Sequence, residues 1–247
     1  MTLPEDNLII SIKTHNCPRC GSSKVVRNGR DKKGKQKFHC HNCRAYGTLE
    51  PTVAYSPERK DEILRAYQER ASMRGIHRIL GVARQTLANW LIEKAARLPD
   101  LAQTLAAARP GDVLELDELW SFVLKKSHKR WIWIALCRRT RPIVAYFVGD
   151  RSQKSCRALW QRLPTAYKHC HTFSDFWEAY QKVFNSGRHH SVGKESGQTA
   201  HVERWNNTLR QRLARFVRQT LSFSKSDAFH ELVLRLFIHT YNAQCIS

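Results

Sequence analysis

Four cysteines near the N-terminus constrain the fold of this chain more than any other feature. They form two pairs, Cys17-x-x-Cys20 and Cys40-x-x-Cys43, with 19 residues between the pairs. A CxxC turn lets two sulfurs reach one ion, and a second such turn completes a tetrahedral site. The alternative is a chance occurrence of two dithiols. We expect residues 1–50 to form a small zinc ribbon whose Zn²⁺ is structural, since four thiolates leave no open coordination position.

The charge of the chain indicates its kind of partner. Lys and Arg number 42 against 21 Asp and Glu, which gives a formal net charge of +21. Such an excess argues against an ordinary near-neutral metabolic enzyme and favours a polyanion, with nucleic acid ahead of a membrane surface. The sequence shows no signal peptide and no apolar run of the length that spans a bilayer. We therefore expect a cytoplasmic protein without a membrane partner.

A helical pattern follows the ribbon, over residues 56–97. Ser56 and Pro57 are typical of a helix start, and two shorter helical stretches flank Gly81. This arrangement predicts a three-helix helix-turn-helix domain. Its last helix would present Arg84, Gln85 and Asn89 to the bases of double-stranded DNA. The alternative is a three-helix packing module that touches no DNA. Residues 98–112 are expected to link this domain to the next.

The remainder, residues 113–247, predicts a mixed α/β domain. Three apolar or alternating segments joined by short polar links favour an antiparallel meander, and later segments alternate between helical and strand patterns. The expected strands are 113–120, 131–138, 143–148 and 171–174, and the expected helices are 152–163, 176–184, 200–219 and 226–241.

Three acids of this domain lie at positions that suit metal ligands. Asp117 lies within the first strand, Asp175 follows a short strand, and Glu203 opens an arginine-rich helix. Converging carboxylates bind hard cations such as Mg²⁺ or Mn²⁺, and two such ions suit phosphoryl transfer. Arg210, two turns after Glu203, would then bind a phosphate. Each acid also has a structural alternative: a strand-end turn, a helix N-cap and a first-turn residue, respectively.

Four segments together resemble the transposases of the first insertion-sequence family, which join a zinc and helix-turn-helix half to an Asp-Asp-Glu catalytic half. The similar segments are Glu115–Trp120, Ser174–Tyr180, His201–Arg215 and Leu221–Ser226 with His230. The resemblance implies a ribonuclease H-like, retroviral-integrase-like fold with Asp117, Asp175 and Glu203 as the metal-binding triad. It also implies recognition of terminal inverted repeats by the N-terminal half. Phe176 departs from the pattern, since similar enzymes tend to have Gly after the second Asp.

These observations predict a bacterial DNA transposase that cleaves and joins strands at the ends of an insertion sequence. Its two halves, often encoded in overlapping frames in similar elements, would be fused here. We expect a homodimer or larger synaptic complex, because two ends must be joined, and association with the nucleoid through DNA. One alternative is a DNA-binding regulator with an inactive α/β dimerisation half. Another is a structure-selective nuclease on the same fold.

Overall fold

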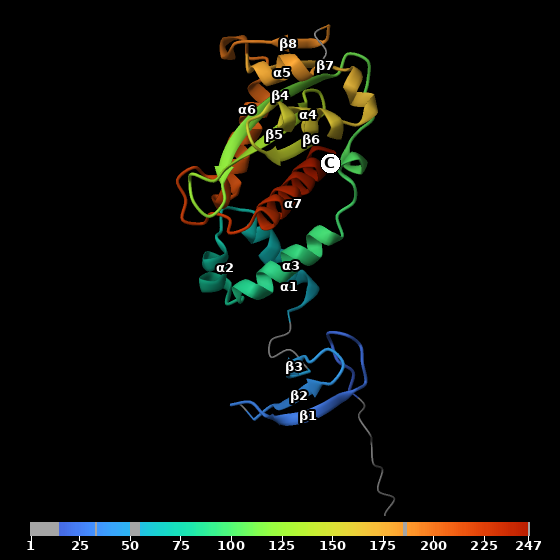
Figure 1. The fold of residues 1–247 in the computed structure, drawn as a ribbon, viewed down its shortest axis with the longest axis vertical. Coiled ribbons are helices and arrows are strands. Elements are labelled where there is room, and N and C mark those ends of the chain that lie inside the picture. Colours follow the sequence, from blue (N-terminus) through green and yellow to red (C-terminus); the bar gives the residue numbers. More distant parts are fainter. Residues whose placement is uncertain (1–14, 33, 50–54, 185–186, 247) are drawn as a thin grey trace, which may run out of the picture. The chain divides into compact units, whose positions relative to one another are not determined.

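The structure, a computed structural model, describes residues 15–32, 34–49, 55–184 and 187–246. The chain divides into two compact units, residues 1–57 and residues 58–247 (Figure 1). Residues 1–14, 33 and 50 of the expected zinc ribbon lie outside the described part. None of the described helices is both long enough and apolar enough to cross a membrane.

The first unit is built on a small antiparallel sheet. Its strands follow the order β1-β2-β3 and are β1 (Val25–Arg30), β2 (Gln36–Cys40) and β3 (Tyr46–Gly47). The two CxxC turns have the same backbone geometry. In each, the amide of the first cysteine, Cys17 or Cys40, donates to the carbonyl five residues later, at 2.9 Å. Gly21 and Arg44, each four residues after that cysteine, have positive φ angles of 73° and 57°.

The second unit begins with the three helices that the sequence predicts: α1 (Pro57–Tyr67), α2 (Met73–Leu80) and α3 (Arg84–Ala96). The Ser72 hydroxyl caps α2 by accepting from the Gly75 amide at 2.9 Å. Gly81 ends α2 with a φ of 70°, a left-handed conformation that glycine adopts at low cost. The helices enclose a small core that includes Ile63 and Leu87.

A five-stranded mixed sheet forms the centre of the rest of this unit. Its order is β6-β5-β4-β7-β8, and its strands are β4 (Val113–Phe122), β5 (Lys129–Cys137), β6 (Ile143–Gly149), β7 (His171–Ser174) and β8 (His189–Ser191). The meander β4–β6 is antiparallel, whereas β7 pairs in parallel with β4, and β8 with β7. The mixed α/β sheet is therefore confirmed, and β8 is an additional strand.

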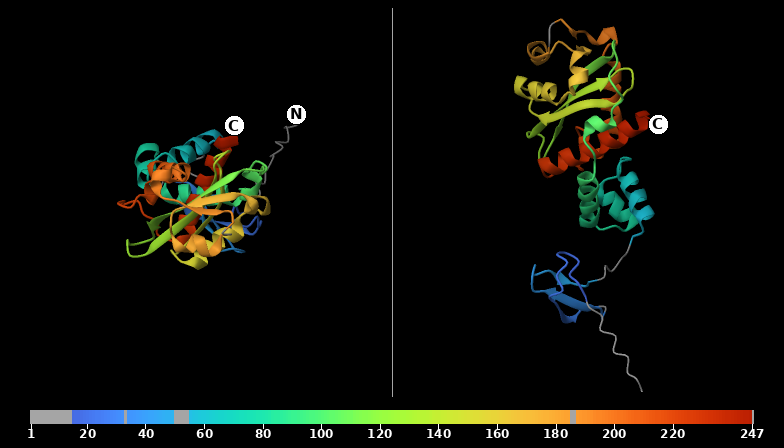
Figure 2. Two further views of the ribbon diagram at one scale, coloured as in Figure 1. Left: turned by 90° about the horizontal axis from the view of Figure 1, so that it is seen from above. Right: turned by 90° about the vertical axis from the view of Figure 1, so that its right-hand side faces the viewer.

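Helices cover both faces of this sheet (Figure 2). They are α4 (Gln153–Arg162), α5 (Glu178–Val183), α6 (Ala200–Arg212) and α7 (Asp227–Ile246). Leu114 and Leu116 of β4 belong to the core cluster beneath α4 and α5. The alternate residues Glu115 and Asp117 face α6 and contact its side chains or backbone. Short 3-10 turns complete the unit at Leu101–Thr104, Thr165–His169, Lys194–Ser196 and Ala214–Phe216.

Three helices differ from the sequence-based expectation, and one of them, α7, continues five residues beyond the expected end at position 241, to Ile246. The helix expected over 200–219 ends at Arg212, where the chain enters a 3-10 turn. Arg215 is buried and donates to the Ser224 hydroxyl at 3.0 Å and to the Tyr67 hydroxyl, so tertiary contacts draw the chain out of the helix. Helix α5 begins at Glu178 and not at position 176.

The three-helix segment α1–α3, the predicted helix-turn-helix, packs on the C-terminal half within this unit. Arg70 Nη1 donates to the carbonyl of Arg210 at 2.7 Å, and Arg212 pairs with Glu69. Helix α3 also contacts α7. The end of α6 is thus tied directly to the turn that follows α1.

Candidate zinc centre and active site

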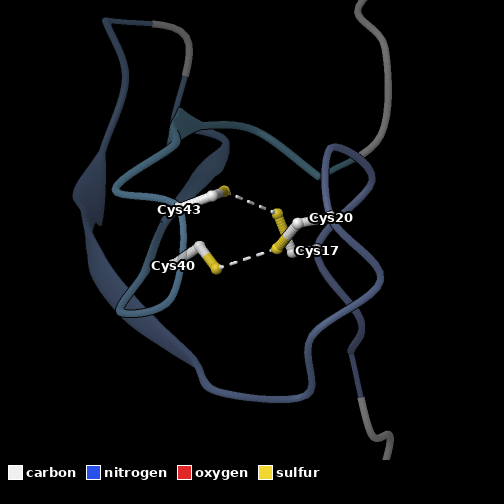
Figure 3. Close-up of side chains that lie close together, drawn as sticks. All are labelled: Cys17, Cys20, Cys40 and Cys43. Carbon is white, nitrogen blue, oxygen red and sulfur yellow. Dashed lines mark hydrogen bonds between the residues drawn. The ribbon is translucent and has the colours of Figure 1, made fainter.

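The four cysteines converge at one point of the first unit, as Figure 3 shows. Their ligand atoms all lie within 4.8 Å of one another. The Sγ atoms of Cys17 and Cys43 are 3.6 Å apart, and those of Cys20 and Cys40 are 3.7 Å apart. A tetrahedral zinc site with Zn–S distances of about 2.3 Å requires sulfurs about 3.8 Å apart. The arrangement of the four sulfurs therefore fits a structural Zn²⁺.

The protonation of these thiols also suits a metal. A backbone hydrogen bond from Ser22 lowers the pKa of Cys20 to about 6, and one from Arg19 lowers the pKa of Cys17. The Ala45 amide likewise lowers the pKa of Cys43, but burial and the neighbouring sulfurs raise it overall, to about 11. Thiolates placed this close repel one another, and a divalent cation relieves that repulsion.

Three separate elements supply the predicted catalytic acids. Asp117 lies within β4, Asp175 directly follows β7, and Glu203 is in the first turn of α6. The parallel register pairs Glu115 of β4 with Phe173 of β7. When the same register is continued by two residues, Asp117 lies opposite Asp175, which directly follows β7. Such strands run about 4.8 Å apart. Helix α6 packs against β4 (Figure 1), which brings Glu203 to the same region.

Each acid has a polar partner of its own. Asp117 Oδ2 accepts from Asn206 Nδ2 at 2.6 Å, and Asp175 Oδ1 accepts from the backbone amide of Trp177 at 3.0 Å. Glu203 Oε1 accepts from the Thr199 hydroxyl at 2.9 Å. Among the described residues, only the four cysteines gather their ligand atoms closely enough to hold an ion. The three acids are neighbours whose oxygens are turned towards separate partners.

The pKa of Asp117 is shifted by burial and by neighbouring acids. Burial raises it most, and the negative charges of Glu118, Asp175 and Glu203 raise it further, to about 7. A hydrogen bond from the Glu118 amide opposes the rise. Because Asp175 and Glu203 both act on Asp117, all three carboxylates share one electrostatic environment. A divalent cation here would favour their ionised forms.

Arg210 brings a half-buried cation to the same region. Its Nε and Nη2 atoms are buried and have no hydrogen-bond partner in the described part of the chain. Burial lowers its pKa most, Arg218 lowers it further, and the nearby Asp117 opposes both. Unsatisfied buried donors cost stability, so they indicate a missing acceptor. A phosphate oxygen has the charge and the acceptor capacity to fill that role.

The motif reasoning missed Glu115, which holds α6 in place. Its side chain is fully buried, and its Oε2 accepts from the backbone amides of His201 and Val202 at 2.9 and 3.1 Å. Its Oε1 accepts from Arg138 Nε at 2.8 Å and from His201 Nδ1 at 2.6 Å. Glu115 thus anchors the start of the helix that carries Glu203. The available signal was the i, i+2 spacing of Glu115 and Asp117, which puts both on one face of a strand.

A second buried acid, Glu118, points to the opposite face. Its Oε1 accepts from Arg151 at 2.6 Å, and its Oε2 accepts from the Tyr180 hydroxyl at 2.9 Å. The Arg151 guanidinium lies 4.7 Å from the Trp131 ring centroid and 4.1 Å from that of Trp177. The positive charge of Arg151 balances the negative charge of Glu118, and the stack holds the residues that follow Asp175 in place. No sequence pattern indicated this contact, because Arg151 comes from a loop after β6.

The expected base-reading residues lie on the surface of α3. Arg84, Gln85 and Asn89 are all exposed, and Gln85 donates to Asn89 at 3.0 Å. Their outward orientation agrees with the helical pattern. Their contact with DNA stays a prediction, as do the roles of the three acids and Arg210.

Comparison with known proteins decides the family. The sequence model of the IS1 transposase matches residues 113–244, and that of the InsA N-terminal domain, a zinc ribbon, matches residues 10–44. The chain belongs to the IS1 transposase family. The resemblance drawn from its motifs is thus confirmed. Membership of a transposase family, together with the zinc ribbon, implies binding to DNA.

Curated relatives agree with this assignment. The insertion element iso-IS1n protein InsB of Shigella dysenteriae is 37% identical over 129 residues, which cover 52% of this chain and 95% of the relative. The insertion element IS1 protein InsB of Shigella flexneri is 35% identical over 130 residues, or 53% and 96% of the two chains. InsB of the element IS1 4 from Escherichia coli K12 is 34% identical over 140 residues, or 55% and 81%. One chain therefore carries an InsA-like ribbon and an InsB-like region.

Proposed function

We propose that this protein is a DNA transposase that binds the terminal inverted repeats of an insertion sequence and catalyses strand cleavage and strand transfer by two-metal-ion phosphoryl transfer. The observation that carries the proposal is the shared environment of Asp117, Asp175 and Glu203 beside Arg210. Three acids held near one another in a half-buried site cost stability, and Arg210, whose buried Nε and Nη2 have no partner among the described residues, would add a phosphate contact. Membership of the IS1 transposase family supports the same chemistry.

We also propose that the α/β region has the ribonuclease H-like fold. Support comes from the strand order β6-β5-β4-β7-β8, with an antiparallel meander followed by two parallel strands. Helices lie on both faces, and the two predicted aspartates come from the adjacent strands β4 and β7. In such a fold, acids from distant parts of the chain would meet over two neighbouring strands of the sheet.

Each residue has a distinct role in the proposed reaction. Asp117, Asp175 and Glu203 would hold Mg²⁺ or Mn²⁺, which when bound supplies activation of the attacking hydroxyl and stabilisation of the leaving oxygen. Arg210 would hold a non-bridging oxygen of the scissile phosphate. Asn206 orients Asp117 through its 2.6 Å hydrogen bond.

In this proposal, the N-terminal half binds the ends of the insertion sequence. Arg84, Gln85 and Asn89 of α3 would read base edges in the major groove, and the zinc ribbon would add contacts to the phosphates. Joining two ends requires a homodimer or a larger synaptic complex. The InsB relatives come from bacteria, so the proposed site of action is the cytoplasm, at the nucleoid.

Cleavage of labelled DNA tests the proposal. The substrate is a duplex that carries the terminal inverted repeat flanking the gene, incubated with Mg²⁺ or Mn²⁺. Asp117→Asn, Asp175→Asn and Glu203→Gln should each abolish nicking while leaving end binding nearly intact, because each removes an ionisable metal ligand and keeps the side-chain volume.

Glu231→Gln is the matched control. Its carboxylate is nearly half exposed on α7 and lies 3.9 Å from Arg162, so this change should leave cleavage unaltered. Normal cleavage by Asp175→Asn would disprove the triad assignment. End binding without metal-dependent nicking by the unmodified protein would instead favour the DNA-binding regulator. Equal cleavage of an unrelated duplex would favour the structure-selective nuclease.

A further inference from the structure

A basic cleft lies between the helix-turn-helix and the segment that follows α6. Its volume is about 1230 Å³. Residues of α2 and the start of α3 form one wall, and residues from the ranges 213–215 and 221–229 form the other. Small-molecule pockets occupy about 300–1,000 Å³, so the cleft suits a segment of a polymer better than a metabolite.

The charge of the cleft is of one sign. Its lining includes Arg74, Arg78, Arg84, Arg215 and Lys225, and no acid from the described part of the chain. Four of these cations, all except Arg215, are exposed and make no hydrogen bond or ion pair with another described residue. Exposed cations that face one another without counter-charges repel, and a bound polyanion removes that repulsion.

The uncharged part of the lining fits the rest of a nucleic-acid strand. Phe223 and Phe229 belong to the wall formed by the 221–229 segment, and Leu221 at the same wall is 94% exposed. Apolar and aromatic side chains beside a cationic track accommodate sugars and bases while the cations hold the phosphates.

The position of the cleft connects base reading to the acids. Arg84 and Gln85 line it from α3, so the expected base-reading side chains and the segment after α6 share one surface. Leu213, on the opposite wall, directly follows the end of α6 and is ten residues after Glu203. At about 1.5 Å per residue this separation is about 15 Å. It corresponds to about four nucleotides of one strand at about 3.4 Å each.

We propose that this cleft binds the sugar–phosphate backbone of one DNA strand of the element end, about four nucleotides from the scissile phosphate. Arg74 and Arg78 contact it from the α2 side, and Lys225 contacts it from the opposite side. The inference rests on the proposed function. Only an enzyme that processes DNA needs a path for one strand from the base-reading helix α3 to the three candidate catalytic acids.

Two substitutions on opposite walls test the cleft: Arg78→Ala and Lys225→Ala. The control is Arg157→Ala, which removes an exposed arginine on α4, outside the cleft lining. The full chain is titrated with two short duplexes, the terminal repeat flanking the gene and an unrelated sequence, between about 50 and 200 mM KCl. Each cleft variant should lower the slope of log K against log salt by about one, on both duplexes.

Phosphate-ethylation interference then locates the contacts. Relative to the unmodified protein, Arg78→Ala and Lys225→Ala should each lose interference at neighbouring phosphates of one strand, within about four nucleotides of the cleavage position. Unchanged slopes with an unchanged interference pattern, or losses matched by Arg157→Ala, would overturn the proposal. Lost positions distributed over both strands would also overturn it.

The failure of this inference is distinguishable from failure of the proposed function. If the cleft variants bind normally while Asp117→Asn abolishes cleavage, the cleft is not the DNA path and the transposase proposal stands. If the cleft variants show the expected slopes and the unmodified protein never cleaves, the cleft binds a strand and the catalytic proposal fails.

Discussion

Asp117→Asn should stabilise the metal-free protein at neutral and higher pH although it abolishes cleavage. The pKa of Asp117 is raised to about 7, first by burial and then by the charges of Glu118, Asp175 and Glu203. The ordinary value for an aspartic acid is about 3.9. Between these values the folded state retains a proton that the unfolded state has released. Stability therefore falls as the pH rises from about 4 to about 7.

The magnitude follows from this interval. One pH unit corresponds to about 1.4 kcal/mol, so the cost of ionising Asp117 reaches about 4 kcal/mol. Since the side chain is only partly buried and water relieves part of this cost, we expect asparagine to recover about 2 kcal/mol at about pH 8. In a protein of this size that gain raises the melting temperature by about 4–8 °C.

Thermal melts of the metal-free protein and the variant, at about pH 4 and about pH 8, measure the effect. The two should melt nearly alike at the lower pH, where folded Asp117 is protonated and the unfolded chain has only begun to release this proton, and separate at the higher pH. Added Mg²⁺ should raise the melting temperature of the unmodified protein at the higher pH and have less effect on the variant. Glu231→Gln should melt like the unmodified protein throughout. A variant that is less stable at the higher pH would refute the reasoning.

Three further predictions follow from the structure. Glu115→Ala should lower the free energy of unfolding, measured in urea, by about 3–5 kcal/mol, because it leaves Arg138 and two amides of α6 without their acceptor. An effect below about 1 kcal/mol would contradict the anchoring role of Glu115. Arg210→Ala should lower the cleavage rate about 10- to 100-fold with little loss of end binding, since a hydrogen bond to a charged group contributes about 1.5–3 kcal/mol. If end binding fell by the same factor as the cleavage rate, Arg210 would act in binding and not in the catalytic step. Chelation of zinc should unfold the ribbon within residues 1–57, because the two compact units are separate. In far-UV circular dichroism, the contribution of residues 1–57 should then be lost while that of residues 58–247 stays unchanged. A cooperative loss of both contributions would contradict this prediction.

Local patterns in the sequence predicted much of the architecture. The spacing of the four cysteines indicated the zinc ribbon, because a CxxC turn is a short-range geometry that four residues encode. The helix start at Pro57 and the break at Gly81 predicted the helix-turn-helix, and alternation in residues 113–148 predicted the meander. These signals depend on neighbours a few positions apart, so no other part of the chain was needed to interpret them.

The errors came from contacts between distant residues. The helix expected to reach position 219 stops at Arg212, because Arg215 is drawn towards Tyr67, a residue of the helix-turn-helix. Strand β8 was missed because its three residues carry little pattern of their own and form a strand only by pairing with β7.

For the candidate site, the sequence by itself determined the identity and order of Asp117, Asp175, Glu203 and Arg210, and the family motifs marked them. Only the tertiary structure decided which charges are buried and what each one contacts. Glu115 anchors α6 because that helix reaches β4 from 86 residues away, and the unpartnered donors of Arg210 become costly only once packing has removed water. The basic cleft likewise exists only where two distant segments face each other. Electrostatic cost depends on burial and distance in space, and a linear sequence records neither.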